Sequence, residues 1–81
     1  MHNDVPPTLD FRDLPAPEPL VRALHAIDTL APGGMVRVLT PMHPQPLLDL
    51  LRSRRLGFST MNCEGGGCAV TVWSEDGAAG A

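Results

Sequence analysis

The sequence predicts an α+β protein, a two-layer α/β sandwich with the element order β-α-β-α-β-β, in which two helices cover one face of a four-stranded mixed sheet. Three patterns lead to this prediction. Two segments place apolar residues at helical spacing, four short segments have strand-like composition, and a run of glycines separates the last two of these. Because strand–helix–strand connections are right-handed, both helices lie on one side if the chain adds strands in a single direction.

The length of the chain and the composition of its ends limit the folded region. A chain of 81 residues has room for one small domain. Residues 1–7 combine polar side chains with two prolines, and Gly77 to Ala81 contain only glycine and alanine. We therefore expect a single domain over residues 8–75, with flexible tails at residues 1–7 and 76–81.

The first strand and the first helix are predicted on either side of a proline-rich turn. Thr8-Leu9-Asp10-Phe11 alternates polar and apolar side chains, which is typical of a strand with one buried face. Pro17 suits the first helical position, where its missing N–H costs nothing. Pro32-Gly33-Gly34 ends this helix. Its expected apolar side comprises Leu20, Val21, Leu24, Ile27, Leu30 and Ala31.

The second strand and the second helix repeat this arrangement. The segment from Met35 to Thr40 is rich in β-branched and apolar residues, as strands are. Three prolines between residues 41 and 46 then lead into a helix that Gly57 is expected to end. Its apolar positions are Leu47, Leu50 and Leu51, and the arginines Arg52, Arg54 and Arg55 complement its C-terminal end.

The last segment, residues 58–73, reads as a hairpin around Glu64-Gly65-Gly66-Gly67. Closing this loop symmetrically predicts a register for the two strands. The expected pairs are Cys63 with Cys68, Met61 with Val70, and Ser59 with Val72.

Composition narrows the classes of function. The chain contains six arginines, no lysine and nine acidic residues, which gives a net charge of −3. A dedicated nucleic-acid binder would present a strongly basic face, so we expect no nucleic-acid partner. No apolar run approaches the roughly 20 residues that cross a bilayer, so we expect no membrane partner and a cytoplasmic location. No spacing of histidine and cysteine is typical of a metal site.

The start of the first helix resembles the TusA-like or SirA-like sulfur carriers. These proteins share a Leu-Asp-x-Arg-x-Leu run that leads into Cys-Pro-x-Pro, and the "RVLTP" and "LGF" segments add to the likeness. The resemblance covers nearly the whole folded region. The matching residues are Leu9, Asp10, Arg12, Leu14, Pro17, Glu18 and Pro19.

Two departures separate this chain from the sulfur carriers. The family's cysteine, which carries sulfur as a persulfide, falls on Ala16, and the usual Asp-Pro after the second strand is replaced by Met42-His43-Pro44. Alanine cannot carry sulfur, so the resemblance does not extend to the sulfur relay. The pattern is more similar to an uncharacterised branch of this superfamily, a domain of unknown function without the cysteine.

These observations predict a small interaction or regulatory module that is not an enzyme. We expect no catalytic residue, no cofactor and no metal, and another protein as the partner. The partner would dock on the loops before both helices. An ordinary solvated role is the alternative for His43 in particular. The candidate partner-binding residues are Arg12, Ala16, Glu18, Arg22 and His43.

The two cysteines offer an alternative function. In the predicted register, Cys63 and Cys68 face one another at a spacing that a disulfide tolerates. They would then form a redox or sulfur-transfer pair. The simpler interpretation is that both are small side chains beside a glycine turn.

The last strand raises the question of a second surface. Trp73 alternates with Ala69 and Thr71, on the face opposite Val70 and Val72. If this face is not covered by helices, it could support a weak homodimer. The alternative is that Trp73 packs at the edge of the sheet.

Overall fold

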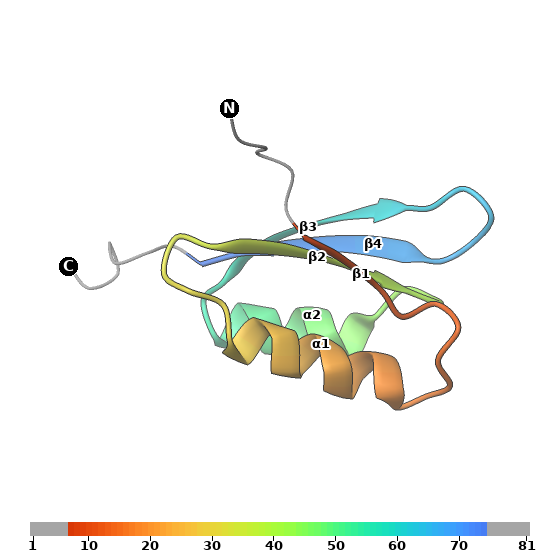
Figure 1. Cartoon of the computed structure of the whole chain (residues 1–81), viewed down its shortest axis with the longest axis horizontal. Coiled ribbons are helices and arrows are strands. Elements are labelled where there is room, and N and C mark those ends of the chain that lie inside the picture. The colour runs from red at the N-terminus through yellow and green to blue at the C-terminus, as the bar shows by residue number, and fades with distance from the viewer. Residues whose placement is uncertain (1–6, 75–81) are drawn as a thin grey trace.

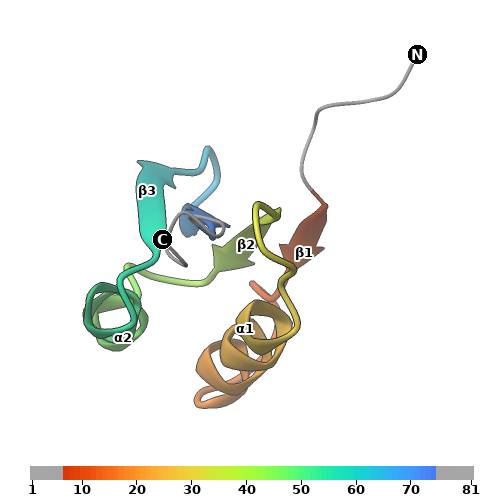
Figure 2. The same ribbon diagram turned by 90° about the vertical axis from the view of Figure 1, so that its left-hand side faces the viewer.

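The computed structural model describes residues 7–74 and confirms the predicted architecture. Its elements are β1 (Thr8–Asp10), α1 (Glu18–Asp28), β2 (Met35–Thr40), α2 (Gln45–Ser53), β3 (Gly57–Asn62) and β4 (Cys68–Trp73). Both helices lie against the same face of the sheet (Figures 1 and 2). The predicted tails fall largely outside the described residues, at residues 1–6 and 76–81, as does Glu75 of the predicted domain.

The four strands form one mixed sheet in the order β1-β2-β4-β3. β1 is parallel to β2, whereas β4 is antiparallel to both β2 and β3. The last strand of the chain therefore inserts between β2 and β3. Both helical connections still step across the sheet in the same direction, which explains why α1 and α2 share one face.

The core lies between that face and the two helices. The even-numbered residues of β2 and β4 point into it, as shown by the alternating burial of both strands. Each helix contributes one apolar stripe. The buried apolar residues are Ala23, Ile27, Val36, Val38, Leu47, Leu48, Leu51, Cys68, Val70 and Val72.

The apolar stripe of α1 differs from the predicted one. Pro19, Ala23 and Ile27 are its buried residues, and Val21 is 53% exposed. The helix ends at Asp28, so Ala31 lies beyond it. Ala23 is fully buried, so a small side chain occupies the centre of the buried face and the larger leucines lie at the margin of the core. Leu20, Leu24 and Leu30 are partly buried there.

The prediction that Gly57 ends α2 is wrong. The left-handed residue that ends this helix is Arg55, with φ 61°. The amide of Leu56 donates to the carbonyl of Leu51 at 3.1 Å. The amide of Arg55 donates to the carbonyl of Arg52 at 3.0 Å. These two bonds form a Schellman motif, which usually has glycine where Arg55 stands. Gly57 is instead the first residue of β3.

The hairpin exists, but its predicted register is wrong by one residue. Asn62 faces Cys68, and Cys63 faces Gly67 through an N–H···O bond of 3.0 Å. The amide of Gly66 donates to the carbonyl of Cys63, which closes a turn centred on Glu64 and Gly65. The three consecutive glycines with positive φ allow three residues, rather than the predicted four, to connect the last paired residues of the two strands. This difference shifts the pairing of the strands by one residue. The other predicted pairs are replaced by Met61 with Ala69 and Ser59 with Thr71.

Candidate functional site

Both helices begin with the same four-residue pattern, x-Pro-x-Pro. In α1 it is Ala16-Pro17-Glu18-Pro19, and in α2 it is His43-Pro44-Gln45-Pro46. The first proline of each pattern is the N-cap, and no side chain caps either helix. Pro17 therefore stands one position before the helix rather than inside it. Its fixed φ still suits a helix start.

The prolines remove most of the hydrogen-bond donors that a helix start normally offers. Proline has no N–H, and the amide of Glu18 already donates to the carbonyl of Pro15 at 2.9 Å. In α2, the amide of Gln45 donates to the carbonyl of His43 at 3.1 Å. In the first turn of each helix, only Leu20 and Leu47 keep an amide without an acceptor among residues 7–74. Neither helix start therefore presents the array of N–H groups that holds an anion.

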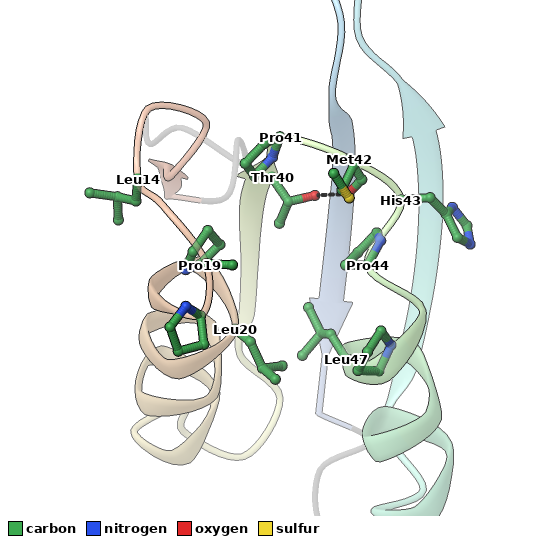
Figure 3. A pocket seen from close by; sticks show the side chains of 12 residues that line it. Leu14, Pro19, Leu20, Thr40, Pro41, Met42, His43, Pro44 and Leu47 are labelled. Atoms are coloured by element: carbon green, nitrogen blue, oxygen red, sulfur yellow. Dashed lines mark hydrogen bonds between the residues drawn. The ribbon is translucent and has the colours of Figure 1, made fainter.

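Between these two helix starts lies an apolar pocket of about 390 Å³, which we call the proline pocket. Its size falls within the range of about 300–1,000 Å³ that is usual for ligand sites. Figure 3 shows Leu20 and Leu47 pointing toward one another from the two helices. The pocket is lined by Leu14, Ala16, Pro17, Pro19, Leu20, Thr40, Pro41, Met42, His43, Pro44, Pro46 and Leu47.

The two polar lining residues contribute little polarity to the proline pocket. Thr40 is buried, and its hydroxyl donates to the carbonyl of Met42 at 2.8 Å. The imidazole of His43 points away from the space between the helices (Figure 3). The walls therefore consist of proline rings and aliphatic side chains. Such a pocket favours an apolar group over a charged one.

The structure distributes the predicted partner-binding residues over three hollows. Ala16 and His43 both line the proline pocket. Arg12 lies in a polar hollow beside the glycines of the β3–β4 turn. Glu18 and Arg22 line a third hollow between β1 and α1. The structure therefore does not bring the five candidate residues together in one site.

The charged members of this set are paired with near neighbours. Arg12 binds both carboxylate oxygens of Asp10, with Nε–Oδ1 at 2.9 Å and Nη2–Oδ2 at 2.8 Å. These bonds lower the pKa of Asp10 from 3.8 to about 2 and raise the pKa of Arg12. Arg22 Nε donates to Glu18 Oε1 at 3.1 Å, one helical turn away. Both are exposed pairs of the kind that contributes little to stability.

The two cysteines do not form the predicted cross-strand pair. Both are free thiols, and the corrected register pairs Cys68 with Asn62 and Cys63 with Gly67. Since neighbouring pairs of a ladder alternate between faces, the two thiols leave opposite faces of the hairpin. Cys68 is 2% exposed, and burial raises its pKa. Cys63 is partly exposed.

The loops before both helices, predicted as the docking site, form part of the proline pocket, but several of its wall residues were not predicted as site residues. Leu20 and Leu47 were assigned to the core, and Met42 was treated only as a departure from the sulfur carriers. One signal could have indicated the pocket: the x-Pro-x-Pro pattern occurs twice, each time after a strand. The ends of the parallel strands β1 and β2 lie at the same edge of the sheet, so two identical turns that follow them must be neighbours.

Within residues 7–74, no three side chains of His, Cys, Asp or Glu are grouped so that they could hold a metal ion. No helix in that range is long and apolar enough to cross a membrane.

The sheet order and the shared helix face define an α/β fold of the SirA-like type. The crystal structure of a SirA-like protein from Desulfitobacterium hafniense superimposes with a TM-score of 0.72 at 24% identity, covering 85% of this chain and 97% of that one. This likeness shows the fold. Residues 8–73 match DUF2249, described as an uncharacterized conserved protein, and the chain belongs to that family. No curated protein matches.

Proposed function

We propose that this protein is a non-enzymatic interaction module that receives an apolar side chain of a partner protein in the proline pocket. The observation behind this proposal is the lining of the pocket. Ten of its twelve lining residues are aliphatic, proline or methionine, and the two polar ones are Thr40 and His43. A buried aliphatic or aromatic side chain gains about 1.5–3 kcal/mol from such surroundings.

The chemistry of the site supports binding rather than catalysis. The resemblance to the sulfur carriers puts their cysteine at Ala16, and a methyl group can neither form a persulfide nor act as a base. The prolines of both helix starts leave few N–H groups to stabilise a developing negative charge. What the site offers is a preformed apolar cavity on rigid turns, which is suited to anchoring one side chain of a partner.

Charged groups near the pocket would orient a bound partner. Glu18 and Arg22 extend from the first turns of α1, and His43 stands beside the start of α2. Arg22 and His43 are exposed and Glu18 is partly exposed, so a partner can reach them without displacing core residues. We propose the cytoplasm as the place of this interaction, as expected from the sequence.

The test is a titration of ¹⁵N-labelled protein with short peptides that each carry one leucine, methionine or phenylalanine. We expect chemical-shift changes centred on the amides of Leu20 and Leu47, and none with the matching alanine peptides. Ala16→Leu would fill the pocket and abolish these changes. Ala31→Leu, at an exposed alanine near the other end of α1, would keep them. Equal responses of the two variants would contradict the proposal.

The redox alternative stays a prediction and has its own test. Thiol labelling of the protein purified without reductant, followed by intact-mass measurement after a persulfide donor, monitors Cys63 and Cys68 separately. Our proposal expects Cys63 to label in the folded state and Cys68 only after unfolding, because Cys68 is buried and its pKa is raised. A retained sulfur atom or a reversible bond between them would favour the redox function instead.

A further inference from the structure

The free edge of β3 lacks the features that keep sheet edges from pairing. β3 has six residues, Gly57–Asn62, and contains neither a charged residue nor a proline. Its pairing with β4 is continuous, without a bulge. Edge strands are normally protected by such features or by being very short. The opposite edge illustrates this, because β1 has only three residues and ends at the ion-paired Asp10.

The hydrogen-bond pattern shows which backbone groups face the free edge. The amide of Cys63 donates to the carbonyl of Gly67, so this pair is hydrogen-bonded. Pairs alternate along an antiparallel ladder, so Met61 and Ser59 also bond to β4. The N–H and C=O groups of Phe58, Thr60 and Asn62 therefore point away from β4. The side chains from Ser59 to Asn62 are exposed, which leaves this edge accessible.

We propose that this edge pairs antiparallel with the same edge of a second copy of the chain. A two-fold axis at Thr60 sets Thr60 opposite itself and Phe58 opposite Asn62. Every outward-facing amide and carbonyl of these residues then has a partner, and the two sheets become one continuous sheet. Such a contact is isologous and closes after two copies. It uses the edge of the sheet and leaves the open face and the proline pocket free.

Charges at the two ends of β3 favour a second copy as the occupant. Arg55 precedes the strand and Glu64 follows it, and both are exposed. Neither forms an ion pair within residues 7–74. Antiparallel pairing places Arg55 of one copy beside the Glu64 end of the other, and symmetry repeats this contact. Parallel pairing would instead place like charges together, which is unfavourable.

The first test measures the mass of the full chain in solution by sedimentation over a concentration series. We expect the mass of two chains for the natural sequence. Thr60→Lys would place two cations opposite each other on the axis, and we expect it to give the mass of one chain. Thr8→Lys makes the same change on the exposed β1 edge and would leave the dimer intact. Circular dichroism would verify that both variants fold.

The second test addresses the charges and the direction of pairing. Glu64→Arg would raise the dimer dissociation constant about tenfold, because two attractive contacts become repulsive. Adding Arg55→Glu would restore the original value. The proposal is overturned if the natural chain has the mass of one copy at every concentration, if Thr60→Lys remains a dimer, if Thr8→Lys dissociates it, or if the double variant stays as weak as Glu64→Arg.

Discussion

At Gly57, the backbone of β3 lies directly against the indole of Trp73. The two residues are cross-strand partners, and a Cβ atom at position 57 would overlap the Nε1, Cε2 and Cδ1 atoms of Trp73. The tryptophan therefore covers a glycine of an edge strand, a known way of stabilising such strands. Of the two interpretations of Trp73, this contact favours packing at the edge. The open-face homodimer stays a prediction.

This contact predicts that Gly57→Ala lowers the free energy of unfolding by about 1–3 kcal/mol, the usual cost of overpacking. Urea unfolding would measure the loss. In a Trp73→Leu background the same alanine should cost less, because the indole it overlaps is absent. An equal cost in both backgrounds would show that the steric contact is not the cause.

Asp10 and Arg12 give the stability a dependence on acidic pH. The pKa of Asp10 is about 2 in the folded protein and 3.8 ordinarily, so folding favours the ionised carboxylate. Its contribution is fully present above pH 3.8 and is lost as the pH falls through about 2. The urea midpoint of the natural protein should therefore exceed that of Asp10→Asn at neutral pH, and the difference should shrink across this window. A difference that stays constant would contradict the assignment.

At the scale of elements, α2 joins the core to the proline pocket through one residue. Leu47 is 1% exposed and also lines the pocket, whereas Met42 lines the pocket but is 72% exposed. Leu47→Ala should lower the free energy of unfolding by about 2–5 kcal/mol because it leaves a cavity in the core. Met42→Ala should change it by no more than about 0.5 kcal/mol. Thermal unfolding of both variants would distinguish the pocket residue that stabilises the fold, Leu47, from the one that does not, Met42.

The existence and type of each element could be predicted because periodicity and turn residues act locally. β2 was predicted over the residues that form it, Met35–Thr40. The errors occur where tertiary contacts or unusual backbone decide the outcome. Arg55 adopts a conformation usually reserved for glycine, and the buried face of α1 is centred on Ala23 rather than on the leucines. The hairpin register depends on the turn around Gly65. A run of glycines is compatible with more than one turn geometry, so the sequence does not decide the register.

The candidate site could be predicted only in part. The likeness to the sulfur carriers pointed to Ala16, and the structure places it in a pocket with His43. Arg12 was predicted as a partner-binding residue on the same loops as His43, but its guanidinium is held by Asp10 in a different hollow. The repeated x-Pro-x-Pro pattern indicates that the two helix starts act together, but it does not show which side chains form the walls of the pocket between them.

At the scale of the molecule, the proline pocket and the free β3 edge are separate surfaces, whereas the polar hollow of Arg12 shares Pro41 with the pocket. The proline pocket lies at the starts of both helices, the polar hollow of Arg12 lies beside the β3–β4 turn, and the free β3 edge faces away from β4. The pocket and the edge share no residue. A dimer formed through the edge would therefore carry two pockets, and a partner with two apolar anchors could bind both at once. Such two-point binding strengthens attachment without any new contact.

The position of β4 in the sheet also governs when this protein can fold during synthesis. β4 is the last strand made, yet it lies between β2 and β3 and supplies Val70 and Val72 to the core. While the ribosome still encloses residues 68–73, neither β2 nor β3 has its antiparallel neighbour. The core then also lacks the buried side chains that β4 supplies. The sheet therefore cannot be completed before residues 68–73 have left the ribosome. Until then the uncharged β3 segment is available to chaperones, or to other nascent chains.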